Sequence, residues 1–103
     1  MLLEIYRVTK EFPADEKFGM ISDMRRAANT VAHNIAEGFG RFENKDKSRF
    51  YKISRGSSYE FISQLFVSHA LHFLSQDDKE NLTSGYKVVI NELDLIIKAV
   101  ESR

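Results

Sequence analysis

The chain has 103 residues, with 15 Lys and Arg against 15 Asp and Glu, so its formal net charge at pH 7 is zero. This length and a hydrophobic fraction of 43% predict one domain over residues 1–103 with a single core, and exclude a disordered or membrane-embedded chain. The zero net charge excludes a small protein that coats nucleic acid through bulk positive charge, but it does not exclude a local basic patch.

The first two predicted helices follow from the apolar spacing, since one proline and five glycines are too few for many strands joined by tight turns. A short helix over 2–12 is expected to end before Pro13, because proline and the residue before it disfavour helical backbone. Apolar residues then recur at spacings of three and four from Ile21 to Ile35, which predicts a second helix. We expect Gly38 to cap this helix and residues 38–42 to form a loop.

A third helix is predicted from about Asn44 to Leu74, and two of its faces are apolar. One face carries Phe50, Ile53, Ser57, Phe61, Gln64, Ser68 and Leu71. A nearly opposite face carries Tyr59, Ile62, Phe66, Ala70 and Phe73. Such a helix lies at the centre of its own domain or is shared with a neighbouring subunit. The second set is therefore predicted to form an oligomer interface.

The fourth predicted helix begins after Ser75 or Asp77, either of which is a good N-terminal cap. Its apolar residues follow a spacing of four and three to the end of the chain: Leu82, Tyr86, Val89, Leu93, Ile96 and Val100. One short and three long helices joined by short loops predict an all-α, antiparallel up-down four-helix bundle with a shortened first helix.

The sequence gives no support for a catalytic or metal site. No glutamate is followed by a histidine three positions on, which excludes the paired Glu-x-x-His ligands of a di-iron bundle. His69 and His72 lack a third ligand at helical spacing, and the absence of cysteine excludes thiolate sites. His33 and Glu37 are interpreted as a local helix pair rather than a general base with its orienting acid. We expect a cytoplasmic protein without enzymatic activity, cofactor, metal or membrane span.

A polar stripe lies beside the apolar face of the predicted second helix, and a comparable polar group lies on the third. We interpret these side chains as one structural network that satisfies itself across the two helices: Arg26, Asn34, Glu37, Arg41, Ser57 and Glu60. The alternative interpretation is a ligand site. Gly56 lies inside a long helix, where glycine costs about 1 kcal/mol relative to alanine, so we expect it to allow a close backbone contact.

Positive charge is concentrated in residues 41–55, which hold six basic residues against Glu43 and Asp46 and have a net charge of +4. Guanidinium and ammonium groups beside aromatic residues suit phosphates and unstacked bases, and Phe42 and Tyr51 lie nearby in the sequence. The predicted nucleic-acid-binding residues are Arg41, Lys45, Arg49, Lys52 and Arg55, with Arg25 and Arg26 as secondary candidates.

The string from Asn34 to Arg41, Asn-Ile-Ala-Glu-Gly-Phe-Gly-Arg, resembles the bacterial four-helix bundle proteins called 23S rRNA intervening-sequence proteins. Phe12-Pro13, Arg25-Arg26-Ala27 and Gly56-Ser57 continue the resemblance, which covers nearly the whole chain. Family members usually carry further residues before Leu2, so the resemblance implies either a misassigned start or a shortened first helix. Asp23 stands where the family commonly has glutamine, and we infer no role for that side chain.

The resemblance also has implications for assembly and binding. A related branch, the accessory variability protein of diversity-generating retroelements, forms a pentameric barrel and binds nucleic acid and the reverse transcriptase. The resemblance thus implies a non-enzymatic homopentamer that binds RNA or DNA. The alternative function is that of a structural adaptor, which binds a protein partner such as a reverse transcriptase.

Overall fold

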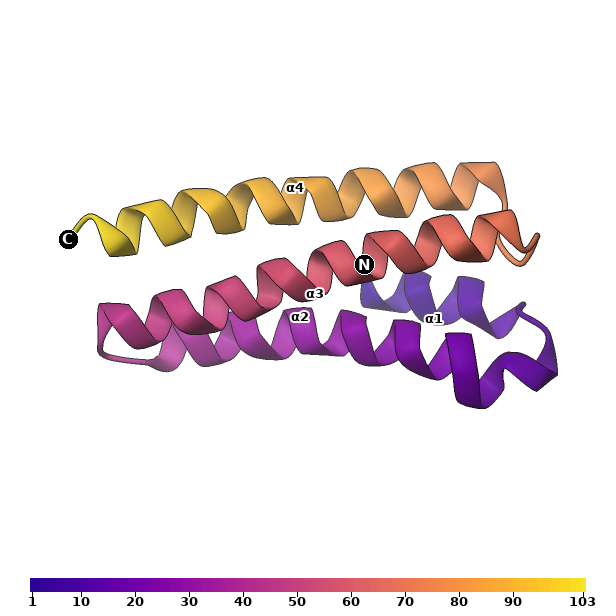
Figure 1. The fold of residues 1–103 in the computed structure, drawn as a ribbon, viewed down its shortest axis with the longest axis horizontal. Helices are drawn as coiled ribbons and strands as arrows, with labels where there is room; N and C mark the ends of the chain where they lie inside the picture. Colours follow the sequence, from indigo (N-terminus) through magenta and orange to yellow (C-terminus); the bar gives the residue numbers. More distant parts are fainter.

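Four helices run up and down beside one another in the computed structural model, which describes all 103 residues (Figure 1). Their bounds are Leu2–Lys10 for α1, Ser22–Gly40 for α2, Asn44–Ala70 for α3 and Gln76–Glu101 for α4. A 3-10 turn, η1 (Ala14–Glu16), and a π-helical turn, η2 (Lys17–Ile21), join α1 to α2. The predicted all-α, up-down four-helix bundle with a short first helix is confirmed. No helix combines the length and apolar character that crossing a membrane requires.

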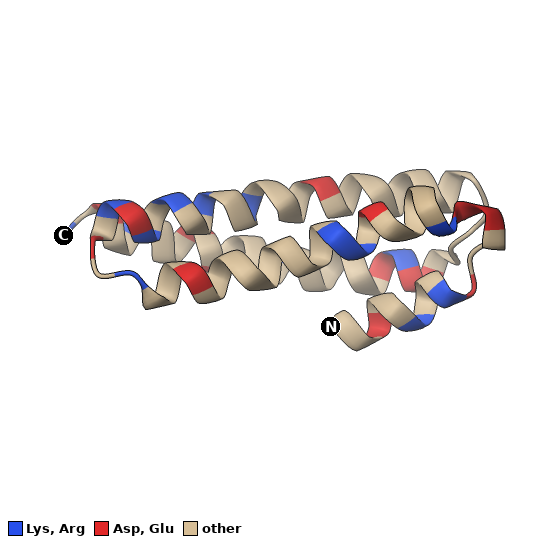
Figure 2. Ribbon diagram, turned by 90° about the horizontal axis from the view of Figure 1, so that it is seen from below, with Lys and Arg blue, Asp and Glu red and all other residues tan.

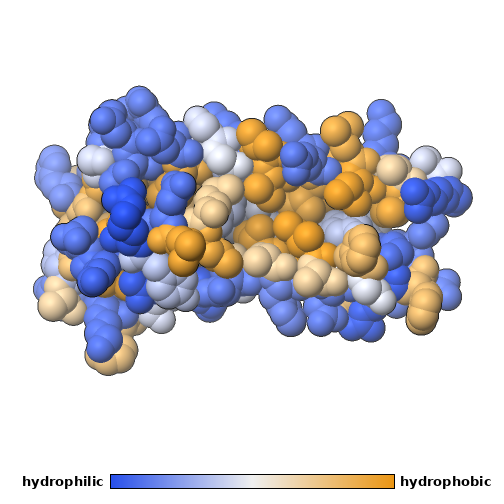
Figure 3. All heavy atoms as spheres, turned by 180° about the vertical axis from the view of Figure 1, so that it is seen from behind, coloured by the Kyte–Doolittle hydropathy of each residue, from blue (hydrophilic) through white to orange (hydrophobic).

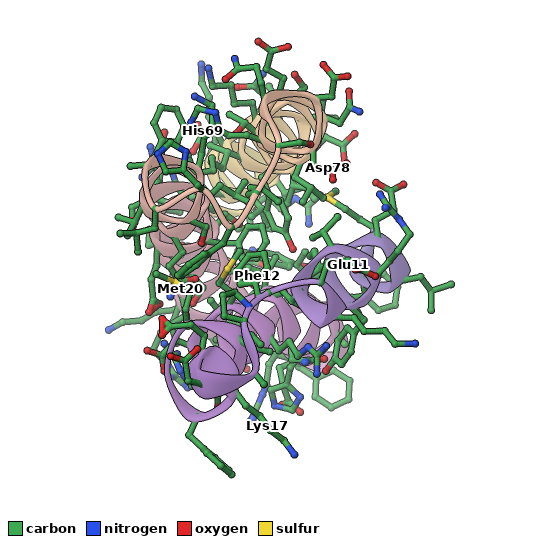
Figure 4. The ribbon with its side chains drawn as sticks, turned by 90° about the vertical axis from the view of Figure 1, so that its right-hand side faces the viewer. Glu11, Phe12, Lys17, Met20, His69 and Asp78 are labelled. Carbon is green, nitrogen blue, oxygen red and sulfur yellow. The ribbon has the colours of Figure 1, made fainter.

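The short α1 lies beside only part of the bundle, and its start is near the middle of the long axis (Figure 1). Ile5, Val8 and Phe12 bury their side chains in the main core. The Phe12 and Phe73 ring centroids are 5.6 Å apart. Figure 4, which looks onto this end of the bundle, shows Phe12 near the centre and Lys17 at the outer edge. The chain leaves helical geometry just before Pro13, as predicted.

Beyond the start of α1 the bundle consists of three helices, and its core is smaller. A second cluster there contains only Tyr51, Leu93 and Ile97 as buried residues. An apolar hollow opens beside the first residues of α1, and its lining includes Leu3, Ala32 and Val89. Figure 3, which shows the face opposite to that of Figure 1, has hydrophobic residues gathered near its middle.

Gly38 does not end α2, so the prediction of a glycine cap there is wrong. The helix continues to Gly40, and Gly38 is buried inside it against the ring of Tyr51. The backbone turns at Arg41, which is extended with φ −83° and ψ 151°. Lys47 Nζ donates to the carbonyl oxygens of Gly38 at 3.3 Å and Phe39 at 2.9 Å, and so satisfies the open end of the helix. The loop is therefore only residues 41–43.

The buried face of α3 is rotated relative to the first face predicted from its large apolar residues. Phe61 and Ser68 are buried as predicted, but Ile53 and Leu71 are exposed. Four serines share the buried face with three larger residues: Ser48, Tyr51, Ser54, Ser58, Phe61, Leu65 and Ser68. Ser54 Oγ donates to the Val31 carbonyl of α2 at 2.7 Å. Small side chains let the two helices approach, and the carbonyl satisfies the buried hydroxyl.

The end of α3 comes at Ala70, four residues before the predicted end. His72 has a positive φ of 65°, and its N–H donates to the His69 carbonyl at 3.0 Å. The Phe73 N–H donates to the Ser68 carbonyl at 2.9 Å. These two bonds around a left-handed residue form a Schellman motif, which ends the helix and places Phe73 against Phe12.

The start of α4 is capped by Ser75, whose Oγ accepts a hydrogen bond from the Asp78 N–H at 3.1 Å. Four residues of the predicted seam are buried: Leu82, Tyr86, Leu93 and Val100. Ile96 is exposed, and Ile90 and Ile97 are buried in addition to the predicted residues. The Phe61 and Tyr86 ring centroids, 4.6 Å apart, join α3 to α4 in the main core.

Candidate nucleic-acid interface

The basic residues of 41–55 lie at one end of the bundle, where α2 turns into α3 and α4 ends. We call this region the basic end; it comprises Arg41, Lys45, Lys47, Arg49, Lys52 and Arg55. Figure 2 shows Lys and Arg gathered on the first half of α3, close to the C-terminus of the chain. The availability of each cation to a ligand depends on whether it already has a partner within the chain.

Three of these cations are paired with carboxylates. Lys52 Nζ lies 2.5 Å from Oε2 of Glu101, and Arg55 Nε lies 2.6 Å from Oδ1 of Asp94, both on α4. The hydrogen bond that Arg55 donates to Asp94 raises the pKa of the Arg55 guanidinium. Arg41, just after the end of α2, lies 3.2 Å from Glu37 of that helix. These groups are less available to a phosphate because a carboxylate already compensates each charge.

Three cations of the basic end have no carboxylate partner: Lys45, Lys47 and Arg49. Lys47 donates to the carbonyls at the end of α2, so only Lys45 and Arg49 remain unpaired. Arg49 is instead held against Phe50, with its Cζ 4.3 Å from the ring centroid. Arg41 Cζ lies 4.7 Å from the same centroid. Phe50 thus holds two guanidinium groups close together, and only one of them has a carboxylate partner. A cation–π contact fixes the position of a guanidinium without neutralising it.

An open hollow between the start of α3 and the end of α4 contains both unpaired cations. Its charged lining residues are Lys45, Asp46, Arg49, Lys52, Glu101 and Arg103. Four basic side chains thus face two acidic ones. The surface is mildly positive and shallow, which suits an extended chain of phosphates better than a small enclosed ligand.

The two secondary candidates, Arg25 and Arg26, lie away from this end. Arg26 precedes Arg41 by roughly 22 Å along the helix at 1.5 Å per residue. Arg25 Nε donates to Thr9 Oγ1 at 3.0 Å, and its Cζ lies 4.3 Å from the Tyr6 ring centroid. Arg25 therefore attaches α1 to α2, and the structure does not bring either residue together with the basic end.

The six residues predicted as one polar network do not form one, because three of them bond to groups four residues away in the sequence and one makes no side-chain hydrogen bond. Only Arg26 and Glu60 meet across α2 and α3, at 2.6 Å, and this hydrogen bond raises the pKa of Arg26. Arg41 pairs with Glu37, and Asn34 Nδ2 donates to the Thr30 carbonyl at 2.9 Å. The sixth residue, Ser57, makes no side-chain hydrogen bond.

The three histidines do not come together in one site. His33 Nε2 is 3.9 Å from Oε1 of Glu37; the His33 side chain is largely in solvent and that of Glu37 is half-buried. His69 and His72 lie at the other end of the bundle, on either side of the α3 terminus. No three His, Asp or Glu residues are close enough to hold a metal ion together.

The aromatic neighbours of the basic end differ from those expected. Tyr51 is buried under Gly38 and cannot reach a ligand. Phe42 is 96% exposed, and Phe39, which the sequence reasoning did not select, is 80% exposed. The sequence signal for Phe39 is its place between two glycines, in a stretch that is also typical of a helix cap and loop.

A second surface of interest runs along α3 and consists of exposed residues that we call the α3 face: Gly56, Tyr59, Ser63, Phe66 and Ala70. Tyr59 is 49% and Phe66 51% exposed. Two other residues of the predicted interface are half-buried and pack against the chain's own core, Ile62 and Phe73.

Gly56 also lies on the exposed side of α3. A Cβ added there meets nothing within 4 Å. The expected close backbone contact at Gly56 therefore does not occur within one chain.

Two comparisons with known proteins bear on this geometry. Residues 1–94 match the profile of the family described as 23S rRNA-intervening sequence protein. No curated protein matches the sequence.

Proposed function

We propose that this chain, which belongs to the 23S rRNA-intervening sequence protein family, is a non-enzymatic protein that binds nucleic acid through its basic end. Lys45 and Arg49 are the residues assigned to phosphate contacts. Arg41 is a supporting residue, because Phe50 holds it beside Arg49. Lys52 and Arg55 are expected to contribute less to phosphate binding, since Glu101 and Asp94 compensate their charges.

The observation that carries the proposal is the pair of uncompensated cations beside exposed aromatic rings. A phosphate that binds Lys45 and Arg49 displaces no intramolecular carboxylate, so the full interaction is available for binding. Arg49 is also fixed by Phe50, which lowers the entropy lost when a phosphate binds. The zero net charge of the chain means that contacts must come from this local surface rather than from bulk charge.

Self-association strengthens this proposal and rests on the α3 face. Residues at a strict spacing of three and four alternate in size along it: Gly56, Tyr59, Ser63, Phe66 and Ala70. All five are exposed in the single chain. Such alternation allows the large side chains of one helix to fit over the small residues of another copy. The family resemblance implies a pentamer, in which five basic ends would act on one nucleic acid.

A salt titration tests the nucleic-acid proposal. We expect Lys45→Ala/Arg49→Ala to weaken RNA binding and to reduce the slope of log affinity against log salt by about 1.4, which corresponds to two lost phosphate contacts on a single strand. The matched control, Lys10→Ala/Lys17→Ala, removes the same charge near the other end of the bundle and should leave the slope unchanged. Equal effects of both variants would reject the basic end as the site.

The α3 face also favours a second candidate function, an adaptor whose exposed apolar surface binds a protein. Light scattering separates self-association from this candidate. We expect Tyr59→Glu/Phe66→Glu to reduce the measured mass to that of a monomer, and Leu95→Glu on exposed α4 surface to leave it unchanged. If wild type is already a monomer, the α3 face is assigned to another protein instead.

A further inference from the structure

Two phenylalanine rings project into solvent around the turn between α2 and α3. Phe39 is in the last helical turn of α2, and Phe42 is in the three-residue loop that follows. Neither ring belongs to a core cluster. Phenylalanine is usually buried, so two exposed rings within four residues need a separate explanation.

The backbone that carries these rings is well fixed. Lys47 Nζ donates to the carbonyls of Gly38 and Phe39 and closes the end of α2. Arg41 is extended, and the Lys47 N–H donates to the Glu43 carbonyl at 3.0 Å in the first turn of α3. The rings therefore project from an ordered short turn, and a flat ligand can stack on them at a low cost in backbone entropy.

The residues around the rings distinguish a surface suited to bases from a neighbouring surface suited to phosphates. Gly40 has no side chain, and a Cβ there would meet nothing within 4 Å, so this residue does not crowd either ring. Lys47 Nζ lies 5.9 Å from the centroid of the Phe39 ring, so one face of that ring already has a cation near it. Three acidic residues, Glu37, Glu43 and Asp46, and only one basic residue, Arg41, line the hollow beside Phe42, and this negative balance disfavours a phosphate there. The unpaired Lys45 and Arg49 line the neighbouring hollow, and a phosphate is favoured on that side.

We propose that Phe39 and Phe42 stack on unpaired bases, so that the ligand class of the basic end is single-stranded nucleic acid. This inference rests on the proposed function and specifies its substrate. In a duplex each base is already stacked between its neighbours. An exposed aromatic ring of the protein therefore finds no free base face on which to stack. In a single strand each base offers a free face, and stacking on an aromatic side chain is worth about 1–3 kcal/mol per base.

The test measures binding of a labelled, unstructured oligoribonucleotide, the same sequence as DNA, and the same RNA annealed to its complement. We expect Phe39→Ala and Phe42→Ala each to weaken single-strand binding by about five- to 150-fold. Duplex binding should be weaker in wild type and unchanged in the variants. The RNA and DNA arms show which sugar the site accepts.

The matched control is Phe18→Ala, which removes a 91% exposed ring in η2, near the other end of the bundle. It should leave all affinities unchanged. Phe42→Leu keeps an apolar side chain but removes the aromatic face, and should lose nearly as much affinity as Phe42→Ala. Since both rings are exposed, circular dichroism should show an unchanged helix content in every variant.

Failure of the inference and failure of the proposed function give different results. If Lys45→Ala/Arg49→Ala loses binding but both Phe variants bind like wild type, stacking is overturned and the phosphate site stands. Duplex binding equal to or tighter than single-strand binding also overturns the inference. If wild type binds none of the three probes at low salt, the proposed function itself fails.

Discussion

Gly38 of α2 and Tyr51 of α3 lie so close that a Cβ at position 38 would be 2.7 Å from Cε1 and 2.9 Å from Cδ1 of the tyrosine ring. Tyr51 is buried and forms the small core beneath the basic end together with Leu93 and Ile97. The ring occupies the space that a side chain at position 38 would need. The short turn that carries Phe39 and Phe42 therefore depends on a glycine inside the helix.

Replacing Gly38 should destabilise the fold. Overpacking typically costs about 1–3 kcal/mol. The better helix propensity of alanine returns up to about 1 kcal/mol. We expect Gly38→Ala to lower the free energy of unfolding by about 1 kcal/mol or more in urea denaturation. Gly40→Ala is the control, because nothing lies within 4 Å of its Cβ. An equal loss in both variants would contradict the close contact with Tyr51.

Gly56 should respond in the opposite direction. It lies in the interior of α3, is exposed, and has open space around its Cβ position. We expect Gly56→Ala to raise the free energy of unfolding of the monomer by about 1 kcal/mol, because alanine is the better helix former. Sedimentation at increasing concentration should show weaker self-association if a second copy packs there. A loss of stability in the monomer would contradict the open position.

The left-handed residue that ends α3 offers a stabilising substitution. An L-residue in this conformation costs about 1–2 kcal/mol relative to glycine. We expect His72→Gly to raise the free energy of unfolding by about 1 kcal/mol, measured by thermal denaturation. His69→Gly, the same change three residues earlier inside the helix, should lower it by about 1 kcal/mol. A loss of stability in His72→Gly similar to that in His69→Gly would show that His72 is not strained.

Glu101 should make stability depend on pH. Hydrogen bonds from Lys52 and Ser48 lower its pKa in the folded protein. The folded-state pKa lies below the unfolded value of about 4.3, so this contribution is complete above that value and is lost as pH falls through the folded-state pKa.

The measurement for Glu101 is the urea midpoint of wild type and Glu101→Gln over a series of pH values. We expect their difference to be largest near neutral pH and to disappear at strongly acidic pH. Glu92→Gln is the control, since Glu92 is exposed and has no ion-pair partner. A difference for Glu101→Gln that does not change with pH would contradict the contact with Lys52.

The number, order and approximate bounds of the helices were predictable from the sequence, because their signals are local. Pro13 forces the end of α1, Ser75 caps α4, and apolar residues at spacings of three and four define α2 and α4. The up-down arrangement follows from short loops between long helices. The string from Asn34 to Arg41 likewise indicated the family that residues 1–94 match.

The buried face of α3 could not be predicted from the sequence, because the rule that large apolar residues are buried fails there. Its core positions include Ser48, Ser54 and Ser58, whereas Ile53 and Leu71 face solvent. Small residues are buried where a neighbouring helix comes close. That proximity is a property of two helices together, so the spacing along one helix does not report it.

The candidate site shows the same division between local and non-local information. The concentration of positive charge in residues 41–55 is visible in the sequence. Which cations remain unpaired depends on carboxylates of α4, such as Asp94, which lies 39 residues after Arg55. Tertiary structure alone brings these charges together, compensates Lys52 and Arg55, buries Tyr51, and leaves Lys45 and Arg49 without a partner.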